Sequence, residues 1–541
     1  MRDDLTSVPS IWETLRAQFQ AEPRSGGDIG GLSASTVYSA PIRLTLREAV
    51  ASALKNNPGL QSQSLEPLAQ QQAILAAQAQ FDPIVGAEGL INRLVQPSGT
   101  QLSGAAISTT NNGDWNFFLS KRLLTGAQFR VDWLNNRFNT DSEFQGLAPQ
   151  YQPQGLISLN QPLLRGFGLY FTRLQIWIAE TTTDAAIATY RANAANFVRQ
   201  VVQSYWRLVA AEEGLKVLES SLELARQTVR DNRIRVDVGV LPPVAVKESE
   251  AEAARREEEV IVGANLRDQA RRSLRQIVYY ASGVNDFPRP VEPVDQPMVD
   301  RVHADYESAF QSAMANRPEI EAARLAVRGS ELTVDFNKNQ LLPRVDIVGG
   351  YGINGLSGNA DQRISPITGQ PQVNSFGGTY GDGLGRMFSG DFYSYQGGIR
   401  IEVPIANAGA DAAYTQSRVQ QQQSESSYRQ QVSNVALEVG QAVGDVTSNL
   451  QRIAATRVAR ELSDENLRNQ TKRYDVGMVT TTDLLIFQDQ VARARLSEIQ
   501  ATVDYNNSIA ELERSQGTLL QRFNILIAPR GETETPLWAR F

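Results

Sequence analysis

The chain is an internal duplication, because landmarks of its first half recur in the same order in its second half. Pro58 and Pro83 recur 260 residues later as Pro318 and Pro343, with no gap between the two matches. Further along, a second pair of segments matches at a distance of 238 residues, Arg235 to Gly239 with Arg473 to Gly477. A period this long indicates a duplicated domain rather than a short solenoid repeat.

Composition narrows the possible functions. The net charge of −7 disfavours a nucleic-acid partner, which requires a basic surface. No cysteine is present, which excludes disulfides, thiolate metal sites and cysteine catalysis. No run of about 18 apolar residues occurs, so a membrane-spanning part would have to consist of strands. Residues 1–31 are polar and lack the apolar centre of a secretory signal, so no signal peptide is seen.

Long helices with a coiled-coil seam are the most specific signal. From Ala194 to Val229, uncharged residues recur in steps of three and four, and the same seam returns 238 residues later from Val432 to Ile453. This predicts a long helix over residues 169–234 and, in the second half, a return helix over 482–517. The seams alone fit an ordinary antiparallel coiled coil as well as a channel. The charged run from Arg255 to Glu259 has the spacing of solvated pairs, so we expect it on an outer face.

Alternating apolar and polar residues predict half-buried strands in both halves, for example around Phe129 and around Ile347. The first half has 18 more residues than the second between equivalent prolines, and we assign the surplus to an extra hairpin near residues 115–138. Glycine-rich stretches at 97–113 and 355–390 are predicted to be loops.

No catalytic, cofactor or metal-binding constellation is visible. His303 is the only histidine and has no ligand cluster around it. The segment Gly381 to Gly385 resembles a phosphate loop only superficially, because it lacks a flanking strand and helix in the right order. An enzyme built on a helical bundle is therefore the weakest of the possible readings.

The ordered motifs resemble the TolC family of outer-membrane efflux proteins over about residues 44–520. Four motifs carry the resemblance: Leu44 to Pro58, the junction Gln161 to Gly168, the hairpin tips around Gly239 and Gly477, and the ending Tyr505 to Leu520. The resemblance implies a mainly α fold with a β portion, in which duplicated antiparallel coiled-coil hairpins form a periplasmic α-barrel. Each subunit of a homotrimer is expected to give four strands to a twelve-stranded outer-membrane β-barrel. The extra hairpin departs from this plan and leaves the strand number open.

The implied function is that of a passive exit duct of a tripartite efflux or type I secretion system. The implied location is the outer membrane of a Gram-negative-type bacterium, extending into the periplasm. Its partners would be a periplasmic adaptor, an inner-membrane transporter and outer-membrane lipid, with no nucleic acid, cofactor or catalysis. The alternative is a soluble, elongated coiled-coil scaffold with a β appendage, which detergent dependence would distinguish from the duct.

Site residues follow from the same resemblance. The adaptor-docking tips would comprise Arg235, Gly239, Val240, Arg473, Tyr474, Gly477 and Met478. Both glycines have a second explanation, since they suit the end of a helix. Asp483 is the candidate pore gate, where three copies would place three carboxylates around one axis. It is equally consistent with an aspartate that favours a helix N-terminus. The family's next acid is Ile486 here, and the equivalent of Asp483 in the first half is Ala245.

The expected organisation follows the duplication. A polar segment (1–43) precedes a first repeat (44–281), with strands at about 84–161 and a long helical hairpin at about 168–281. A linker (282–304) leads to the second repeat (305–520), with strands at about 344–404 and a hairpin at about 407–520, and a tail (521–541) follows.

Overall fold

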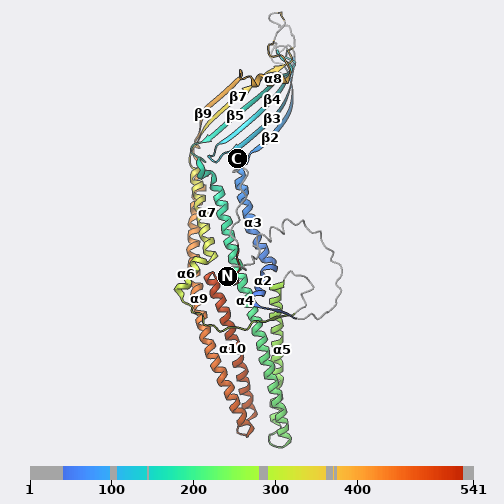
Figure 1. The fold of residues 1–541 in the computed structure, drawn as a ribbon, viewed down its shortest axis with the longest axis vertical. Helices are drawn as coiled ribbons and strands as arrows, with labels where there is room; N and C mark the ends of the chain where they lie inside the picture. The colour runs from blue at the N-terminus through green and yellow to red at the C-terminus, as the bar shows by residue number, and fades with distance from the viewer. Residues whose placement is uncertain are drawn as a thin grey trace, which may run out of the picture. The chain divides into compact units, whose positions relative to one another are not determined.

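The computed structural model describes residues 41–97, 106–142, 145–279, 290–360, 369–370 and 374–527. Its described residues form two compact units (Figure 1). The first unit contains residues 41–69, 184–325 and 426–527, and the second contains 70–183 and 326–425. Each unit is therefore assembled from segments of both repeats. The predicted segments 1–43 and 521–541 lie largely outside the described residues, whereas residues 290–304 of the predicted linker lie within them.

Two long helical hairpins, one from each repeat, confirm the predicted helices. In the first repeat α4 (Gly168–Asp237) is followed by α5 (Val244–Tyr279). In the second repeat α9 (Ala408–Asp475) is followed by α10 (Thr481–Gln516). The helices of the two hairpins have nearly equal lengths, 70 and 36 residues against 68 and 36. The duplication has thus preserved hairpin length.

The predicted seam is where these helices are buried. Val201 and Leu208 of α4 have no exposed surface, and neither do Val435 and Val439 of α9. They belong to two apolar clusters, the first built on α4 with α2 and α5, the second on α9 with α6 and α10. Each fully buried aliphatic side chain contributes roughly 1.5–3 kcal/mol, which explains why the uncharged seam positions recur in both repeats.

Shorter helices and strands accompany the hairpins in the first unit, and two of these helices, α3 and α7, have their second parts in the second unit. In the first repeat they are β1 (Ile42–Leu44), α2 (Leu46–Asn56) and α3 (Pro58–Gln78), and in the second β6 (Val291–Pro293), α6 (Tyr306–Asn316), α7 (Pro318–Gln340) and α11 (Leu519–Arg522). Both repeated prolines open a helix, because a preceding residue in an extended conformation suits proline. Gly517 ends α10 at a φ of +76°, and a Cβ there would lie 2.7 Å from the carbonyl of Asn316. Only glycine fits this junction.

The second unit is built on one antiparallel sheet whose strands follow chain order (Figure 1). The 3-10 turn η1 (Ala79–Phe81) leads into it. Its six long strands are β2 (Ile84–Pro97), β3 (Ile107–Arg122), β4 (Gln128–Thr140), β5 (Gln150–Pro162), β7 (Arg344–Asn354) and β9 (Tyr393–Glu402), and the short β8 (Ser357–Gly358) pairs with β5. The predicted extra hairpin exists as β3 and β4. It begins at Ile107, so the expected loop over 97–113 is wrong for its last seven residues. The resemblance implied four strands per subunit and the extra hairpin left that number open; in the structure the extra pair lies inside the sheet, which has six long strands.

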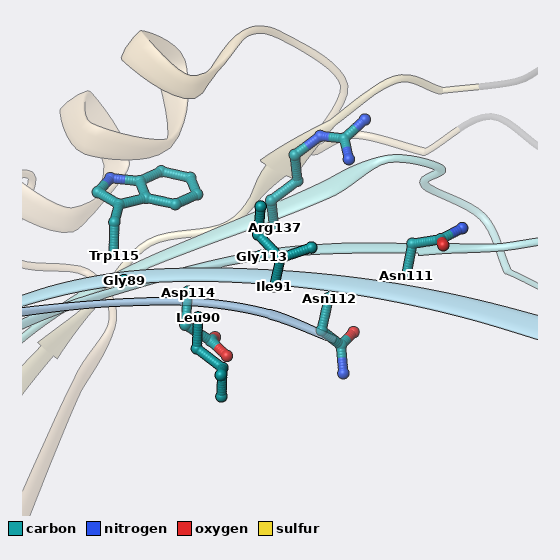
Figure 2. Close-up of a pocket in the computed structure, with 9 residues that line it drawn as sticks. All are labelled: Gly89, Leu90, Ile91, Asn111, Asn112, Gly113, Asp114, Trp115 and Arg137. Carbon is teal, nitrogen blue, oxygen red and sulfur yellow. The ribbon is translucent and has the colours of Figure 1, made fainter. Parts of the chain in front are cut away.

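The two faces of the sheet differ in chemistry, as the alternation predicted. Figure 2 shows Trp115 and Arg137 on one face of the strands, and Leu90, Asn112 and Asp114 on the other. All five residues line one pocket, so the lining of this pocket comes from both faces of the sheet. The face that contains Trp115 is apolar and largely exposed, and its most exposed members include Val85, Ile91, Phe117, Trp133, Ile157, Tyr351, Tyr395 and Ile399. This face has no covering layer over most of its area in the described part of the chain.

A helix, α8 (Tyr380–Phe388), covers part of the apolar face and corrects the predicted loop over 355–390. The ring of Tyr380 lies 5.5 Å from that of Trp115, and its hydroxyl donates to Asn135 Oδ1 at 2.5 Å. Glycine content masked this helix in the sequence, although Thr379 and Asp382 form a capping box at its start. Among the helices described, none is long and apolar enough to cross a membrane.

Candidate functional site: the hairpin tips and the contacts between the hairpins

Both hairpin tips close with the same backbone geometry. Gly239 has a φ of +78° and Gly477 a φ of +77°, in the left-handed region that glycine tolerates. In the first tip the amide of Val240 donates to the carbonyl of Arg235 at 2.8 Å, and in the second the amide of Met478 donates to that of Arg473 at 2.9 Å. This is the Schellman closure of a helix end, so both glycines have a structural role.

The side chains at the tips divide into exposed and paired groups. Val240 and Met478 are 68% and 71% exposed. Arg473 is exposed as well. Arg235 and Tyr474 instead contact each other across the two hairpins, with the guanidinium 4.8 Å from the ring centre. The seven candidate docking residues therefore do not form one uniform surface.

The Arg235–Tyr474 contact joins the end of α4 to the end of α9. Arg235 pairs with Asp475 at 2.7 Å and donates to the carbonyl of Tyr474 at 3.2 Å. The buried hydroxyl of Tyr474 bonds Asn232 Oδ1 of α4 and lies 3.1 Å from the hydroxyl of Thr481. We call these five residues the tip contact. Because Tyr474 is 5% exposed, its hydrogen bonds are shielded from water and hold the two hairpins together.

Asp483 lies in the first turn of α10, where it takes part in a capping box. Its carboxylate accepts from the backbone amide of Thr480 at 3.0 Å and from the Thr480 hydroxyl at 2.7 Å, while its own amide donates to that hydroxyl at 3.2 Å. These bonds from the Thr480 side chain and backbone lower the pKa of the Asp483 carboxyl, so it is charged at neutral pH. Its side chain is exposed, Ile486 is half exposed, and Ala245 is buried at the start of α5.

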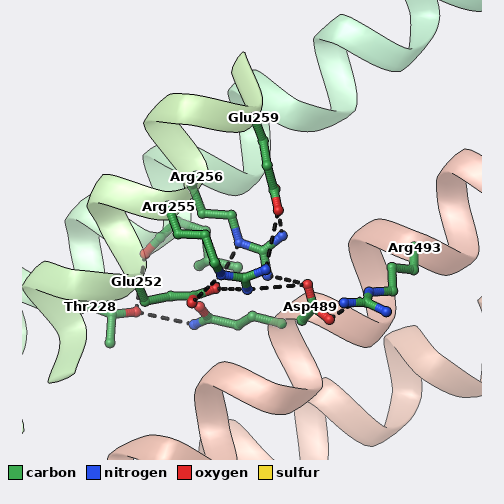
Figure 3. Close-up of polar contacts among 9 residues, drawn as sticks. Thr228, Glu252, Arg255, Arg256, Glu259, Asp489 and Arg493 are labelled. Carbon is green, nitrogen blue, oxygen red and sulfur yellow. Dashed lines mark hydrogen bonds and ion pairs between the residues drawn. The ribbon is translucent and has the colours of Figure 1, made fainter. Parts of the chain in front are cut away.

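A cluster of ion pairs joins the two hairpins beyond the tips (Figure 3). Arg256 of α5 donates to Asp489 of α10 at 2.6 Å and pairs with Glu252 and Glu259 of its own helix at 2.8 and 3.0 Å. Arg255 lies 3.3 Å from Asp489, and Arg493 pairs with it at 2.7 Å. We call these six residues the Arg256–Asp489 cluster. A neighbouring hydrogen bond, from Gln488 to Thr228 at 3.1 Å, joins α10 to α4.

Burial makes this cluster different from an exposed ion pair. The side chain of Arg256 is 4% exposed and that of Asp489 is 19% exposed. Burial by itself would raise the pKa of the Asp489 carboxyl, but the hydrogen bond from Arg256 and the charges of Arg256 and Arg493 outweigh it and hold that pKa below its usual value. Asp489 is therefore ionised, and removal of Arg256 would leave a poorly hydrated negative charge.

The expectation that the charged run of α5 faces solvent is wrong for Arg256. The buried residues Ser249, Arg256 and Ala270, with Gly263 between the last two, recur every seven positions on α5. This heptad was the sequence signal that could have placed Arg256 in the seam. No comparable signal pointed to Asp489, because the partner of a charged residue on another helix is not encoded in local spacing. Within the ranges that the structure describes, no group of residues is suited to hold a metal ion.

Two known outer membrane proteins have similar sequences. BepC of Brucella suis biovar 1 (strain 1330), an outer membrane efflux protein, is 24% identical over 368 residues, which are 66% of this chain and 71% of that protein. The multidrug resistance outer membrane protein MdtP of Escherichia coli (strain K12) is 23% identical over 220 residues, 37% of this chain and 43% of that protein.

Solved structures of outer membrane channels share the fold. The channel OprN superposes with a TM-score of 0.63 at 18% identity and covers 87% of this chain and 89% of its own. CmeC of Campylobacter jejuni has a TM-score of 0.63 at 14% identity, with coverage of 92% and 93%. The family model described as outer membrane efflux protein matches residues 49–278 and 309–518, which include both hairpins and both tips. The match confirms the resemblance seen in the sequence, and the chain belongs to the outer membrane efflux protein family.

Proposed function

We propose that the chain is one subunit of a homotrimeric, passive exit duct in the outer membrane, with its helical hairpins in the periplasm. The duct receives its cargo from an inner-membrane transporter through a periplasmic adaptor. It performs no chemistry itself, in keeping with a family of efflux proteins rather than of enzymes. The transporter supplies the energy, and this chain supplies the passage.

The observation that carries the proposal is the exposed apolar face of the sheet. Ile91 is 88% exposed, Tyr395 80% and Ile399 68%. These three residues belong to the same face of the two outermost strands, β2 and β9. Monomeric soluble proteins rarely expose so continuous an apolar surface. Contact with lipid would remove this apolar surface from water, and the strands of a transmembrane sheet have outward apolar side chains that alternate with inward polar ones. A soluble scaffold would leave this face in water.

Membrane fractionation and detergent dependence test the proposal. The full chain, expressed with an export signal in a Gram-negative host, is expected to fractionate with outer membranes and to remain a trimer in detergent. A variant with the apolar face made polar, Ile91→Asn with Tyr395→Asn and Ile399→Asn, is expected to lose membrane insertion while the isolated helical content is retained. A chain that is monodisperse in buffer without detergent would instead support the scaffold.

The tips are the proposed adaptor-docking surface. Val240 and Met478 are exposed apolar side chains beside two glycine turns of equal geometry. An adaptor would therefore contact two similar apolar surfaces on each subunit. Arg473 adds an exposed positive charge at the second tip. Arg235 and Tyr474 position the tips through the tip contact and are not the groups that an adaptor touches first.

Closure of the duct is proposed to depend on the contacts between the hairpins. The tip contact and the Arg256–Asp489 cluster both join the first hairpin to the second, so an opening that separates the hairpins must break them. Asp483 remains the candidate for a ring of carboxylates in the trimer. Its participation in the cap of α10 fixes where its charge lies, since both carboxylate hydrogen bonds come from Thr480.

A further inference from the structure

The six-stranded sheet has a consequence for the outer end of the duct, and this inference rests on the proposed trimer. We propose that three copies close an eighteen-stranded barrel, in which β9 of one subunit pairs with β2 of the next. The hairpin of β3 and β4 is then part of the barrel wall. The twelve-stranded barrel implied by the sequence resemblance is replaced by a wider one.

The hairpin cannot leave the wall without breaking the sheet on both of its sides. β3 pairs with β2 along the whole of β2, from Ile84 to Pro97, and β4 pairs with β5 from Gln128 to Phe138. Its side chains also follow the same alternation as the rest of the sheet. Phe117 and Trp133 are cross-strand partners on the apolar face, and both are exposed, by 54% and 38%. The hairpin therefore has the surface that a lipid-facing wall requires.

The polar face of the hairpin also matches the wall. Asp132 of β4 is 7% exposed and pairs with Arg130 at 2.7 Å, and Asn136 donates to Asp114 at 2.6 Å. These residues occupy the face opposite to Trp133, where a barrel encloses water. A hairpin folded outside the barrel would place these charged and amide groups against lipid, which is costly.

The outer edges of β2 and β9 need a partner in lipid. Within the described sheet β2 pairs only with β3, and β9 only with β7. The unpaired backbone groups along the other edge of each strand cannot remain without hydrogen bonds in a bilayer. β2 and β9 run in opposite directions, because each strand of the meander is antiparallel to the next. Pairing them between copies therefore continues the antiparallel order.

The register of the sheet allows the barrel to close with the first residue of β2 beside the last residue of β9 of the adjacent copy. Cross-strand partners starting from Ile84 of β2 lead across the sheet to Gln396 of β9, and β9 continues for six residues beyond it to Glu402. Pairing Ile84 with Glu402 of the adjacent copy staggers the wall by six residues over six strands. At roughly 3.3 Å per residue and 4.8 Å between strands, this corresponds to a strand tilt of about 35°. Known outer-membrane barrels have tilts of about 35–45°.

The same register keeps the two faces in agreement across the subunit boundary. It places Ala87 opposite Ile399 and Ile91 opposite Tyr395, all on the apolar face. A slip by one residue would bring apolar side chains of one copy beside polar side chains of the next. Because barrel diameter grows nearly in proportion to strand number, the eighteen-stranded barrel is roughly 1.5-fold wider than a twelve-stranded one. The outer end of the duct would therefore be wide enough for bulkier cargo than a twelve-stranded barrel admits.

Disulfide mapping tests this arrangement, because the native chain has no cysteine. Double-cysteine variants are introduced into the full chain in outer membranes, and two of them, Ala87→Cys with Ile157→Cys and Ala87→Cys with Leu159→Cys, probe the alternative in which β2 lies beside β5. Ala87→Cys with Ile399→Cys is expected to shift the monomer band to a covalent trimer on a non-reducing gel. Ala87→Cys with Phe117→Cys, and Val131→Cys with Ile157→Cys, are expected to lose both free thiols within one chain. The matched control, Ala87→Cys with Arg400→Cys, places the second thiol on the opposite face and is expected to stay uncrosslinked.

The outcomes separate this inference from the proposed function. A chain that forms no trimer in detergent and does not enter membranes would refute the duct itself. A membrane-inserted trimer in which Ala87→Cys reacts with Ile157→Cys or Leu159→Cys, and not with Phe117→Cys, would show that β2 lies beside β5. The hairpin would then be outside the wall, and the eighteen-stranded barrel would be overturned while the duct remained.

Discussion

The two repeats agree in their helices and differ in their strands. The hairpins have 70 and 36 residues in the first repeat and 68 and 36 in the second, whereas the first repeat supplies four long strands and the second supplies two. Helices that pack along a shared seam over their whole length cannot change length without exposing apolar surface. An antiparallel sheet accepts an added hairpin, because a pair of strands returns the chain to the same edge in the same direction.

The repeats also differ in how their charges are placed. The first hairpin has Arg256 inside its seam, while the equivalent position of the second hairpin is occupied by Ala494. In the half of the second hairpin nearer its tip the arginines are more exposed, as in Arg495 with Asp464, whose arginine side chain is 43% exposed. Further from the tip, Arg514 of α10 pairs with Glu438 of α9 and is 10% exposed. The two repeats therefore bury an interhelical arginine at different heights along the hairpin.

The largest effect is expected from Arg256→Ala. Removing one partner of a buried ion pair leaves Asp489 with less compensation, so we expect a loss of about 3 kcal/mol in stability. The matched variant in the second repeat, Arg495→Ala, is expected to cost at most about 1 kcal/mol, because Arg495 is 43% exposed and Asp464 keeps a second partner in Arg460. The thermal unfolding midpoint of the helical circular dichroism signal in detergent measures both, and leak conductance in planar bilayers is expected to rise only for Arg256→Ala. Equal effects of the two variants would remove the distinction between the repeats.

A smaller effect is expected at the two tip glycines, where the repeats should behave alike. Gly239→Ala and Gly477→Ala each force a side chain into the left-handed region and are expected to cost about 1 kcal/mol, since no atom would contact the added Cβ. Asparagine tolerates that region, so Gly239→Asn and Gly477→Asn are expected to retain most of the stability.

The asparagine variants also separate helix termination from docking. If a stable asparagine variant loses adaptor binding, measured by co-purification with a periplasmic adaptor that binds the wild-type chain, the glycine has a docking role. If both asparagine variants bind normally, the glycines only end helices. An alanine variant with wild-type stability would contradict the Schellman closure as the reason for glycine.

The smallest effect is expected at two equivalent capping boxes. Thr45 with Glu48 caps α2 in the same way as Thr480 with Asp483 caps α10, and the threonine hydrogen bonds lower the pKa of both carboxyl groups. A lowered pKa in the folded state contributes stability above the unfolded-state pKa, and this contribution is lost as the pH falls through the folded-state value. We therefore expect Glu48→Ala and Asp483→Ala to lower the unfolding midpoint slightly at neutral pH, and we expect this difference from the wild type to shrink as the pH falls through the lowered folded-state pKa of each carboxyl group.

The same pair of variants tests the gate. Asp483→Ala is expected to increase leak conductance and to weaken cation selectivity in bilayers, and Glu48→Ala, which removes an identical cap elsewhere, is expected to change neither. Asp483→Asn keeps an acceptor for the cap while it removes the charge, so a leak in this variant assigns the effect to charge. Unchanged conductance in both Asp483 variants would leave Asp483 as a cap alone.

Much of the fold was predictable, because it depends on local periodicity. The seam of α4 predicted a helix over 169–234 and the structure has one over Gly168–Asp237. The proline matches predicted that the first repeat has the extra hairpin. The loops were less predictable. The predicted loop over 355–390 contains α8, because its glycines conceal an amphipathic helix whose apolar residues require the sheet as a partner.

For the candidate site, the sequence located the tips but not the contacts that join them. Arg235 and Tyr474 were expected to meet an adaptor, and the structure places them against each other. The sequence did not predict a role for Asp489, because a single aspartate on a helix has no distinguishing neighbours in sequence. Contacts between residues more than 200 positions apart depend on how the hairpins pack, which local patterns do not specify.

By itself the sequence determined the duplication and the paired glycine turns, because landmarks recur 238 and 260 residues apart. It also determined the long helices and the two-faced strands, because these follow from periodicities of two to seven residues along the chain. Only the tertiary structure decided that the extra hairpin lies within the sheet, that α8 covers part of its apolar face and that Arg256 is buried against Asp489. These features are set by which distant segments share a surface. That choice is made by the packing of whole elements, which removes apolar groups from water and pairs buried charges at the same time.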